Sequence, residues 1–168
     1  MNPPARPGDS AAAIDTPALV LDLDAMERNL ARMAAFARGH RLRLRPHAKM
    51  HKSAELARLQ MQHGAVGVCV QKTAEAEALA AGGVNNIYIS NEVVAPHKLA
   101  RVAALAQRLA RDGGQLAIAV DSPQGVAALA EAMHHAHGAH IDVFIEIDVG
   151  HGRCGVPAGE PALALARA

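Results

Sequence analysis

The chain has 168 residues, of which 51% are hydrophobic and only 2% aromatic, and its formal net charge at pH 7 is +1. This charge gives little electrostatic support for binding to nucleic acid or to a membrane surface. No run approaches the roughly 20 apolar residues that a membrane span needs. The length suffices for one domain. Residues 1–14 contain no hydrophobic run, which predicts a flexible leader and not a secretion signal.

Extended and helical patterns alternate along the chain. Extended patterns predict strands at residues 18–23, 41–52, 66–70, 87–90, 116–120 and 142–149. Helical patterns predict helices at residues 24–38, 53–63, 73–81, 96–111, from 122 onward and from 157 onward, with Asp24, Thr73 and Ser122 at helix starts. Strict alternation of this kind predicts parallel βαβ units.

Two α/β architectures satisfy this alternation. About six strands would suit a doubly wound sheet. A (β/α)8 barrel needs eight strands and typically about 250 residues. A barrel formed by this chain would therefore be incomplete.

The basic run RLRLRPHAKMHK, at residues 41–52, is the most informative segment. On a strand, alternate side chains share a face, which puts Arg43, Arg45, His47 and Lys49 on one side. Burying unpaired charge is costly. The row therefore indicates either an exposed edge strand or a pocket that holds an anionic cofactor.

The chemistry of Lys49 favours the pocket. An amine is nucleophilic only when it is neutral, and neighbouring cations favour the neutral form. Arg45, His47, His51 and Lys52 supply such neighbours. A lysine of this kind can form a Schiff base with an aldehyde, and pyridoxal phosphate is an aldehyde cofactor whose phosphate and phenolic oxygen need cationic partners.

A glycine-rich segment, GHGRCG at residues 150–155, has the spacing of a dinucleotide-binding turn. That function requires a helix at the second glycine and an acidic residue about 20 positions later. Pro157 would interrupt such a helix. The alternative, which we favour, is a loop that approaches a ligand closely and carries Arg153 toward it.

The strand before this loop places two carboxylates, Glu146 and Asp148, on one face. Buried carboxylates need cationic partners. Arg43 and Arg45 of the basic run are the expected partners.

The sequence also contains histidines and cysteines, which are residue types that can bind metals. Four histidines follow one another near a helix end: His134, His135, His137 and His140. A solvated surface is the usual setting for such a cluster, so no metal site is predicted. The two cysteines, Cys69 and Cys154, are expected to be unpaired, which fits a reducing cytoplasm.

Four segments together resemble a known family: RPHAKMHK, VCVQKTAEAEALAAGG, IYISNEVV and EIDVGHGRCGV. In this order they are similar to the N-terminal half of bacterial D-threonine aldolases, members of the alanine racemase-like group of pyridoxal phosphate enzymes. That group also includes eukaryotic-type D-serine dehydratases and D-threo-3-hydroxyaspartate dehydratases. The resemblance implies a partial (β/α)8 TIM-type barrel of the alanine racemase N-terminal domain type at residues 15–168. About five of its eight strands would be present, and residues 18–23 would pair with a C-terminal β-domain that this chain lacks.

The resemblance also implies roles for individual residues. Lys49 is similar to the Schiff-base lysine, and Arg153 to the arginine that hydrogen-bonds the phenolic side of the cofactor ring. His47 and Gln71, at strand ends that face the same mouth, are further cofactor-binding candidates. The phosphate-binding glycine loops and the ligands for a divalent metal (Mn, Mg or Zn) would lie after Ala168.

The activity that the resemblance implies is cleavage of β-hydroxy-D-amino acids to glycine and an aldehyde by a pyridoxal phosphate-dependent lyase. The complete protein would be a cytoplasmic homodimer that acts on a small molecule and binds neither nucleic acid nor membrane. Dehydration of D-serine or 3-hydroxy-D-aspartate is the alternative within the family. A non-catalytic pyridoxal phosphate-binding protein is the alternative outside it. The 168-residue chain alone is expected to be a truncated, inactive fragment.

Overall fold

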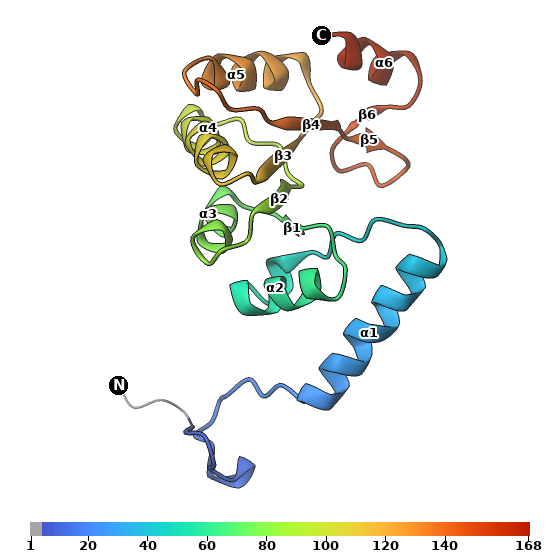
Figure 1. Ribbon diagram of the computed structural model, residues 1–168. Coiled ribbons are helices and arrows are strands. Elements are labelled where there is room, and N and C mark those ends of the chain that lie inside the picture. The colour runs from blue at the N-terminus through green and yellow to red at the C-terminus, as the bar shows by residue number, and fades with distance from the viewer. Residues whose placement is uncertain (1–4) are drawn as a thin grey trace.

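Four parallel strands form the centre of the structure, a computed structural model that describes residues 5–168. Their order in the sheet equals their order in the chain: β1 (Val68–Val70), β2 (Asn86–Ile89), β3 (Gln115–Val120) and β4 (Asp142–Ile145). A helix precedes each strand: α2 (Ala54–Gln62), α3 (Thr73–Ala81), α4 (Pro96–Arg111) and α5 (Pro123–His134). The helices α3, α4 and α5 lie on the same side of the sheet (Figure 1). Sequential order with helices on one face is the winding of a barrel segment, because a doubly wound sheet covers both faces.

The main core lies between the sheet and this helix layer. Side chains of β1 to β3 that point toward the helices are almost completely buried, and they meet apolar side chains of α3 and α4. The largest are Ile87, Ile89, Leu116 and Ile118. Alternation along each strand then assigns the other residues to the opposite face.

The opposite face of the sheet is lined by smaller and more exposed side chains. Ala117 and Ala119 lie here on β3, and the rings of Tyr88 on β2 and Phe144 on β4 approach with centroids 4.9 Å apart. Two small alanines on the central strand allow the two rings to meet across it. Phe144 remains 51% exposed, which makes this face the open, concave side of the arc.

The predicted strand at residues 18–23 is wrong for this structure. Leu19, Val20 and Leu21 are exposed, and none of the described residues pairs with them in a sheet. A strand needs a hydrogen-bonding partner, and here the run instead leads into α1 (Leu23–Gly39), which projects from the sheet (Figure 1). The N-cap of α1 is Asp22 and not the predicted Asp24, because Asp22 Oδ1 accepts the N–H of Ala25 at 2.9 Å. The leader contains a 3-10 turn at Ala11–Ala13, and its residues 1–4 lie outside the described residues.

The predicted basic strand joins the sheet at only a few points. His47 forms an isolated parallel bridge with Cys69, and the carbonyls of Leu44 and Pro46 accept N–H groups of Val66 and Cys69. Pro46 has no N–H of its own to donate, which limits the ladder. A 3-10 turn at Ala48–Met50 then carries Lys49. Four strands and this bridged segment account for the five predicted barrel strands.

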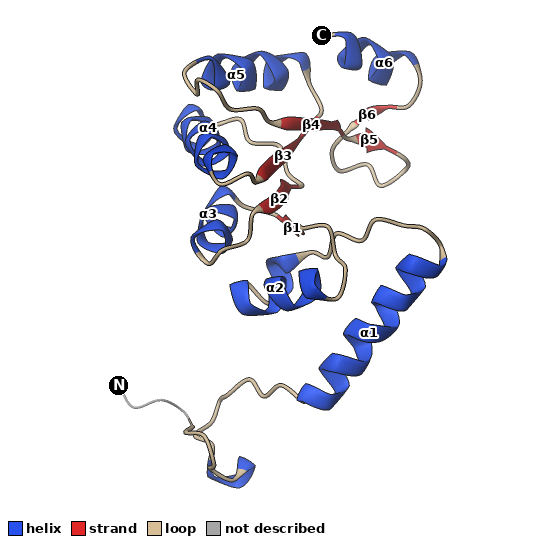
Figure 2. Cartoon of the chain, viewed as in Figure 1, coloured by secondary structure: helices blue, strands red, loops and turns tan. Residues whose placement is uncertain are grey.

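The last predicted strand is interrupted. It consists of β4 and β5 (Ile147–Asp148), and β5 leaves the sheet to pair in parallel with β6 (Val156–Pro157) (Figure 2). The chain then enters α6 (Glu160–Arg167). At α3 the N-cap is Lys72, and the predicted cap Thr73 is the first helical residue. Among the helices of residues 5–168, none is long and apolar enough to cross a membrane.

Candidate functional site

Polar side chains gather where β1 to β4 end, at the carboxyl edge of the sheet. This edge is where parallel α/β folds place their ligand sites, because the loops that follow the strands converge there. Gln71 follows β1, Asn91 follows β2, Asp121 follows β3 and Glu146 follows β4. The turn of Lys49 completes the row next to β1.

A chain of hydrogen bonds connects Lys49 to the ends of β1 and β2. The amine Nζ of Lys49 donates to Gln71 Oε1 at 3.4 Å, and Gln71 Nε2 donates to Asn91 Oδ1 at 2.9 Å. Asn91 Nδ2 in turn donates to the carbonyl oxygen of Glu92 at 3.3 Å. Each amide therefore has a defined orientation, and the Gln71 carbonyl oxygen faces the exposed amine.

His47 lies behind Lys49 and makes two contacts of its own. Its Nδ1 accepts the backbone N–H of Lys49, and its Nε2 lies 3.3 Å from Ser90 Oγ. Burial, and then the positive charge of Lys49, lower the pKa of His47. The ring therefore favours its neutral form at the site.

Arg45 lies below this row and contacts Asn86. Its Nη1 donates to Asn86 Oδ1 at 2.6 Å. Gly67 makes room for the pair, because a Cβ there would lie 2.7 Å from both Arg45 Nη1 and Asn86 Oδ1. The predicted pairing of Arg43 and Arg45 with the carboxylates of Glu146 and Asp148 is therefore wrong, since the carboxylates use other partners.

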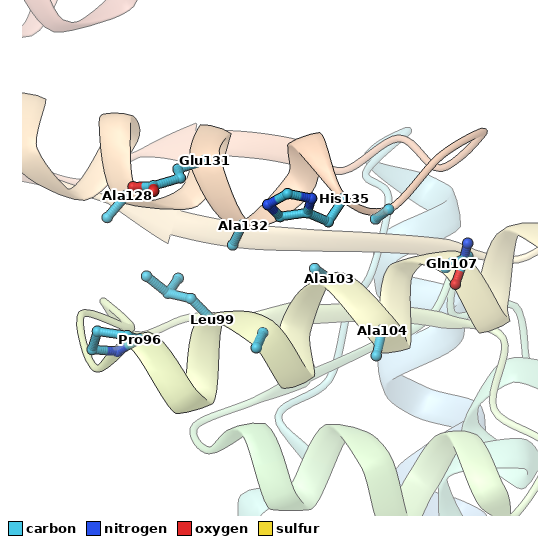
Figure 3. Close-up of a pocket in the computed structure, with 11 residues that line it drawn as sticks. Pro96, Leu99, Ala103, Ala104, Gln107, Ala128, Glu131, Ala132 and His135 are labelled. Carbon is cyan, nitrogen blue, oxygen red and sulfur yellow. The ribbon is translucent and has the colours of Figure 1, made fainter.

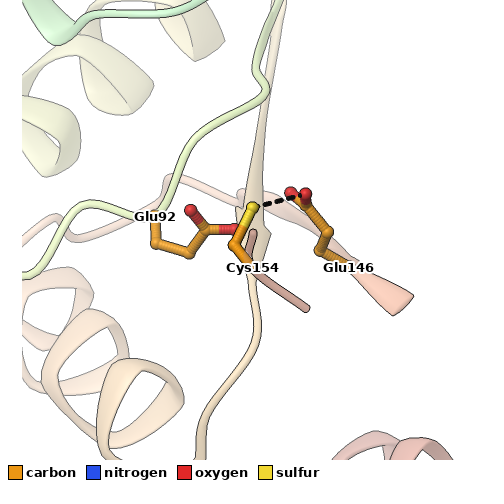
Figure 4. A group of neighbouring side chains, drawn as sticks. All are labelled: Glu92, Glu146 and Cys154. Atoms are coloured by element: carbon orange, nitrogen blue, oxygen red, sulfur yellow. Dashed lines mark hydrogen bonds between the residues drawn. The ribbon is translucent and has the colours of Figure 1, made fainter. Parts of the chain in front are cut away.

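Glu146 belongs to a group of three side chains with Glu92 and Cys154, whose ligand-type atoms lie within 4.8 Å of one another. The Cys154 thiol donates to Glu146 Oε1 at 2.8 Å (Figure 4), and this bond raises the pKa of Cys154. Burial raises the pKa of Glu92, and the negative charges of Glu146 and Asp121 add to the shift. Both shifts favour the protonated forms, which reduce the charge repulsion in this group.

Asp148 organises the glycine loop that carries Arg153. Its Oδ1 accepts the N–H groups of Gly150 at 2.9 Å and Gly152 at 3.0 Å, and these bonds lower the pKa of Asp148. Asp121 Oδ2 holds the far end of the loop by accepting the N–H of Gly155. Gly155 has φ +97°, and a Cβ there would lie 2.6 Å from Asp148 N. The loop therefore depends on glycine for its conformation and for its close approach to β5.

Arg153 is exposed on this loop, next to the acidic group. The Cys154 thiol, followed by Glu146 and Glu92, raises the pKa of Arg153. The structure joins Lys49, His47 and Gln71 by direct hydrogen bonds. None of the hydrogen bonds found in residues 5–168 joins Arg153 to those three.

Three residues of the candidate site were not singled out from the sequence: Ser90, Asp121 and Glu92. Ser90 is the last residue of a predicted strand, and Asp121 and Glu92 follow predicted strands, so a position at a strand end was the available signal. Cys154 was expected to be an unpaired thiol, and both cysteines are free. Its contact with Glu146 depends on a loop conformation that spacing does not define.

Two cavities flank the strand ends and the helix layer. One, of about 500 Å³, is lined by Gln71, Asn91 and Glu92 together with Lys72, Lys98 and Arg101 on its rim. The other, of about 520 Å³, lies between α4 and α5 and is lined largely by alanines (Figure 3). Only the first is adjacent to the polar row, so it is the cavity that concerns the candidate site.

Comparison with known proteins defines the class of this fold. Residues 21–168 match the family described as alanine racemase, N-terminal domain, and the chain belongs to this family. The family and the parallel sheet together confirm the predicted partial barrel.

The chain is similar to several individual proteins. It is 49% identical to a D-threonine aldolase of Arthrobacter sp. over 98% of this chain and 42% of that protein. Identity is 45% to a 3-hydroxy-D-aspartate aldolase of Paracoccus denitrificans, over 98% of this chain and 42% of that protein. The crystal structure of D-threonine aldolase from Filomicrobium marinum matches with a TM-score of 0.94 and 50% identity, over 99% of this chain and 44% of that chain. The chain thus spans less than half the length of the relatives that it matches.

Proposed function

We propose that this chain forms the cofactor-binding part of a pyridoxal phosphate-dependent lyase that cleaves β-hydroxy-D-amino acids to glycine and an aldehyde. One observation carries the proposal. An exposed lysine, Lys49, lies at the carboxyl edge of a parallel sheet, with its amine held toward Gln71 at 3.4 Å. The relatives named D-threonine aldolase and 3-hydroxy-D-aspartate aldolase support the substrate class.

The residues present fit the cofactor in part. Lys49 offers an exposed amine on a short turn, and the neighbouring amides of Gln71 and Asn91 offer hydrogen-bonding groups to a polar ring. Arg153 offers a permanent cation on the glycine loop that Asp148 and Asp121 hold. When bound, pyridoxal phosphate supplies an electron sink that stabilises the charge left at Cα after the Cα–Cβ bond is cleaved.

Each residue then has a stated task. Lys49 would hold the cofactor aldehyde through Nζ, and Gln71 Oε1 orients that amine. Arg153 would donate to the phenolic oxygen of the ring. His47 caps the turn of Lys49, and its lowered pKa favours the neutral ring.

We assign the remaining tasks to the part of the relatives' length that this chain does not span. We place there the phosphate-binding loops, the base that removes the proton from the β-hydroxyl group, and the ligands of a divalent Mn, Mg or Zn ion. We therefore propose that the 168-residue chain alone releases no glycine from D-threonine. We also propose that the complete protein is a homodimer in a reducing cytoplasm, a compartment that suits the free thiols Cys69 and Cys154.

Dehydration is the second candidate function. A D-threo-3-hydroxyaspartate dehydratase of Delftia sp. is 40% identical over 94% of this chain and 40% of that protein. The same lysine and the same cofactor would serve both reactions. Identity is higher to the two aldolases, at 49% and 45%, and this difference favours cleavage.

Chemical trapping tests the role of Lys49. The chain is incubated with pyridoxal phosphate, reduced with borohydride, digested and mapped by mass spectrometry. We expect one pyridoxyl group on the peptide that contains Lys49. The label should be lost in Lys49→Ala and retained in Lys52→Ala, the matched control three residues away, whose amine pairs with Glu75 at 3.7 Å. A label on Lys52 or Lys72 with Lys49 unmodified would refute the proposal.

A further inference from the structure

We propose that His47 is a positioning residue, which holds the turn of Lys49 through a neutral imidazole in the Nε2–H tautomer and releases that turn when the ring becomes protonated. The inference rests on the proposed function in one respect only, namely that Lys49 is the residue to be positioned. Its evidence is a continuous set of hydrogen bonds through the ring.

The first bond defines the state of Nδ1. The backbone N–H of Lys49 donates to His47 Nδ1 at 3.3 Å. A ring nitrogen can accept a hydrogen bond only through a free lone pair. Nδ1 is therefore unprotonated, and it caps the 3-10 turn at Ala48–Met50 that carries Lys49.

The second bond defines the state of Nε2. Ser90 Oγ lies 3.3 Å from His47 Nε2, and it also donates its single hydrogen to the carbonyl oxygen of Val70 at 3.1 Å. With that hydrogen used, Ser90 Oγ can only accept from the ring. Nε2 therefore carries the hydrogen, and the bonds run from the end of β1 through Ser90 and His47 to the backbone of Lys49.

Protonation would break the bond between His47 and the backbone of Lys49. The second proton would enter at Nδ1, so that two N–H groups would face each other between His47 and Lys49. Burial and the charge of Lys49 oppose this protonation, whereas Glu75 on α3, Gln71 and the Cys69 carbonyl on β1 favour it. The balance lowers the pKa of His47, so the turn is held at neutral pH and released in acid.

His51 provides a control built into the same segment. Its Nδ1 accepts the backbone N–H of Ser53, two residues later, at 3.1 Å. The geometry repeats that of His47 and Lys49, but the N–H that His51 accepts belongs to Ser53, the N-cap of α2, and not to the lysine turn. An effect that acts through the position of Lys49 should therefore change when His47 is replaced and should not change when His51 is replaced.

The tautomer is measured directly on this chain, without any cofactor. Two-bond ¹H–¹⁵N spectra distinguish the Nε2–H from the Nδ1–H form of neutral imidazole, and the signals of His47 are those that vanish in His47→Asn. We expect the Nε2–H form at pH 8, with a titration midpoint below that of an exposed histidine. An Nδ1–H tautomer, or a ring that is charged at pH 8, would overturn the inference.

The effect on Lys49 is measured as the rate of pyridoxal phosphate trapping at Lys49 between pH 8 and pH 5. In His47→Asn, the side-chain oxygen can accept the N–H two residues later, as Nδ1 does, and it does not titrate. In His47→Gln, the longer side chain would place its amide at the position of Nε2 instead, so the bond to the Lys49 N–H would be lost. We expect His47→Gln to trap about five-fold more slowly than His47→Asn at pH 8, the effect of one lost hydrogen bond. When the pH is lowered, the trapping rate should fall more in the wild-type chain and in His51→Asn than in His47→Asn.

The outcomes separate the two proposals. Equal rates for the Gln and Asn variants, or equal pH profiles for the wild-type chain and His47→Asn, would overturn the positioning role. Absence of label on Lys49 in every chain would refute the proposed function instead, and the spectra would still decide the tautomer of His47. A variant that fails to fold is recognised by its amide spectrum, and the wild-type tautomer then decides the inference alone.

Discussion

The carboxyl edge of the sheet has two halves of different chemistry. The lysine half contains Lys49, His47, Gln71, Ser90 and Asn91, at the ends of β1 and β2. The carboxylate half contains Asp121, Glu146, Asp148 and Cys154, at the ends of β3 and β4 and on β5 and its loop, together with Glu92, which follows β2. Side chains in the lysine half bond mainly to one another. In the carboxylate half, Asp148 and Asp121 accept backbone N–H groups, and the pKa values of Glu92 and Cys154 are raised.

This difference shows how each half keeps its geometry. Neutral amides and imidazoles cost less to desolvate than charges do, so the lysine half can orient an amine through a connected set of neutral groups. Clustered carboxylates repel one another unless protons or N–H groups compensate. The carboxylate half uses both means, and its result is a fixed glycine loop that carries Arg153.

The largest expected effect on stability comes from adding a Cβ at Gly67, beneath the lysine half. In Gly67→Ala the new Cβ would lie 2.7 Å from Arg45 Nη1, so the contact between Arg45 and Asn86 must open. The new Cβ would lie even closer to the backbone oxygen of Asn86, so β1 must also shift from β2. Overpacking of this kind costs about 3 kcal/mol. Urea unfolding measures the loss. In the control, Gly39→Ala, the new Cβ meets no atom within 4 Å, and equal stability of the two variants would contradict the argument.

The next effect tests whether the carboxylate half serves the lysine half. If Arg153 donates to the phenolic oxygen of the cofactor, Arg153→Ala should weaken pyridoxal phosphate binding about ten-fold, the effect of one charge-assisted hydrogen bond. Absorption titration of the chain gives the affinity. Arg43→Ala removes another exposed arginine and controls for net charge. Equal affinities of the two variants would make Arg153 a structural residue of the loop.

Sequence reasoning predicted the lysine half better than the carboxylate half, for a physical reason. Parallel strands bring consecutive strand ends together, so the approach of Lys49 to Gln71 follows from order alone. The helix at Pro96–Arg111, the helix start near Ser53 and the helix start at Ser122 were likewise local, and they are confirmed. A residue at a strand end or a helix start needs no knowledge of distant loops.

Contacts that depend on chain turns were not predictable in this way. Glu146 and Asp148 were assigned to arginines because they share a strand face, yet the break between β4 and β5 gives each a different neighbour. The run at residues 18–23 has strand-forming side chains, but no described residue offers it a partner. Residue type and alternation define which face a side chain occupies, and they do not define what lies opposite.

The third prediction concerns pH and the carboxylate half. Bonds from the Gly152 and Gly150 N–H groups lower the pKa of Asp148 below its usual value. The resulting stabilisation is complete above the pKa of an unfolded aspartate, about 3.9, and is lost as the pH falls through the folded pKa. Asp148→Asn keeps an acceptor oxygen and removes the charge. We expect it to lower the thermal midpoint at pH 7 and to equal the wild-type chain near pH 2. A difference that persists in acid would point to packing.

The smallest effect has the opposite sign. Burial and the charges of Glu146 and Asp121 raise the pKa of Glu92, so the folded chain binds this proton more tightly than the unfolded chain does. The associated stability is complete below the usual pKa of glutamate and is lost as the pH rises through the raised value. Glu92→Gln carries no titrating carboxyl group and so removes this loss. We expect its free energy of unfolding at pH 8 to exceed that of the wild-type chain by less than about 1 kcal/mol, because solvent screens a partly exposed group. Chemical unfolding at pH 8 and pH 4 measures the gain, which should be present at the first pH and absent at the second. If Glu92→Gln lowers stability at pH 8, the ionised Glu92 is itself a useful acceptor, and the contrast between the two halves is then smaller than their hydrogen bonds indicate.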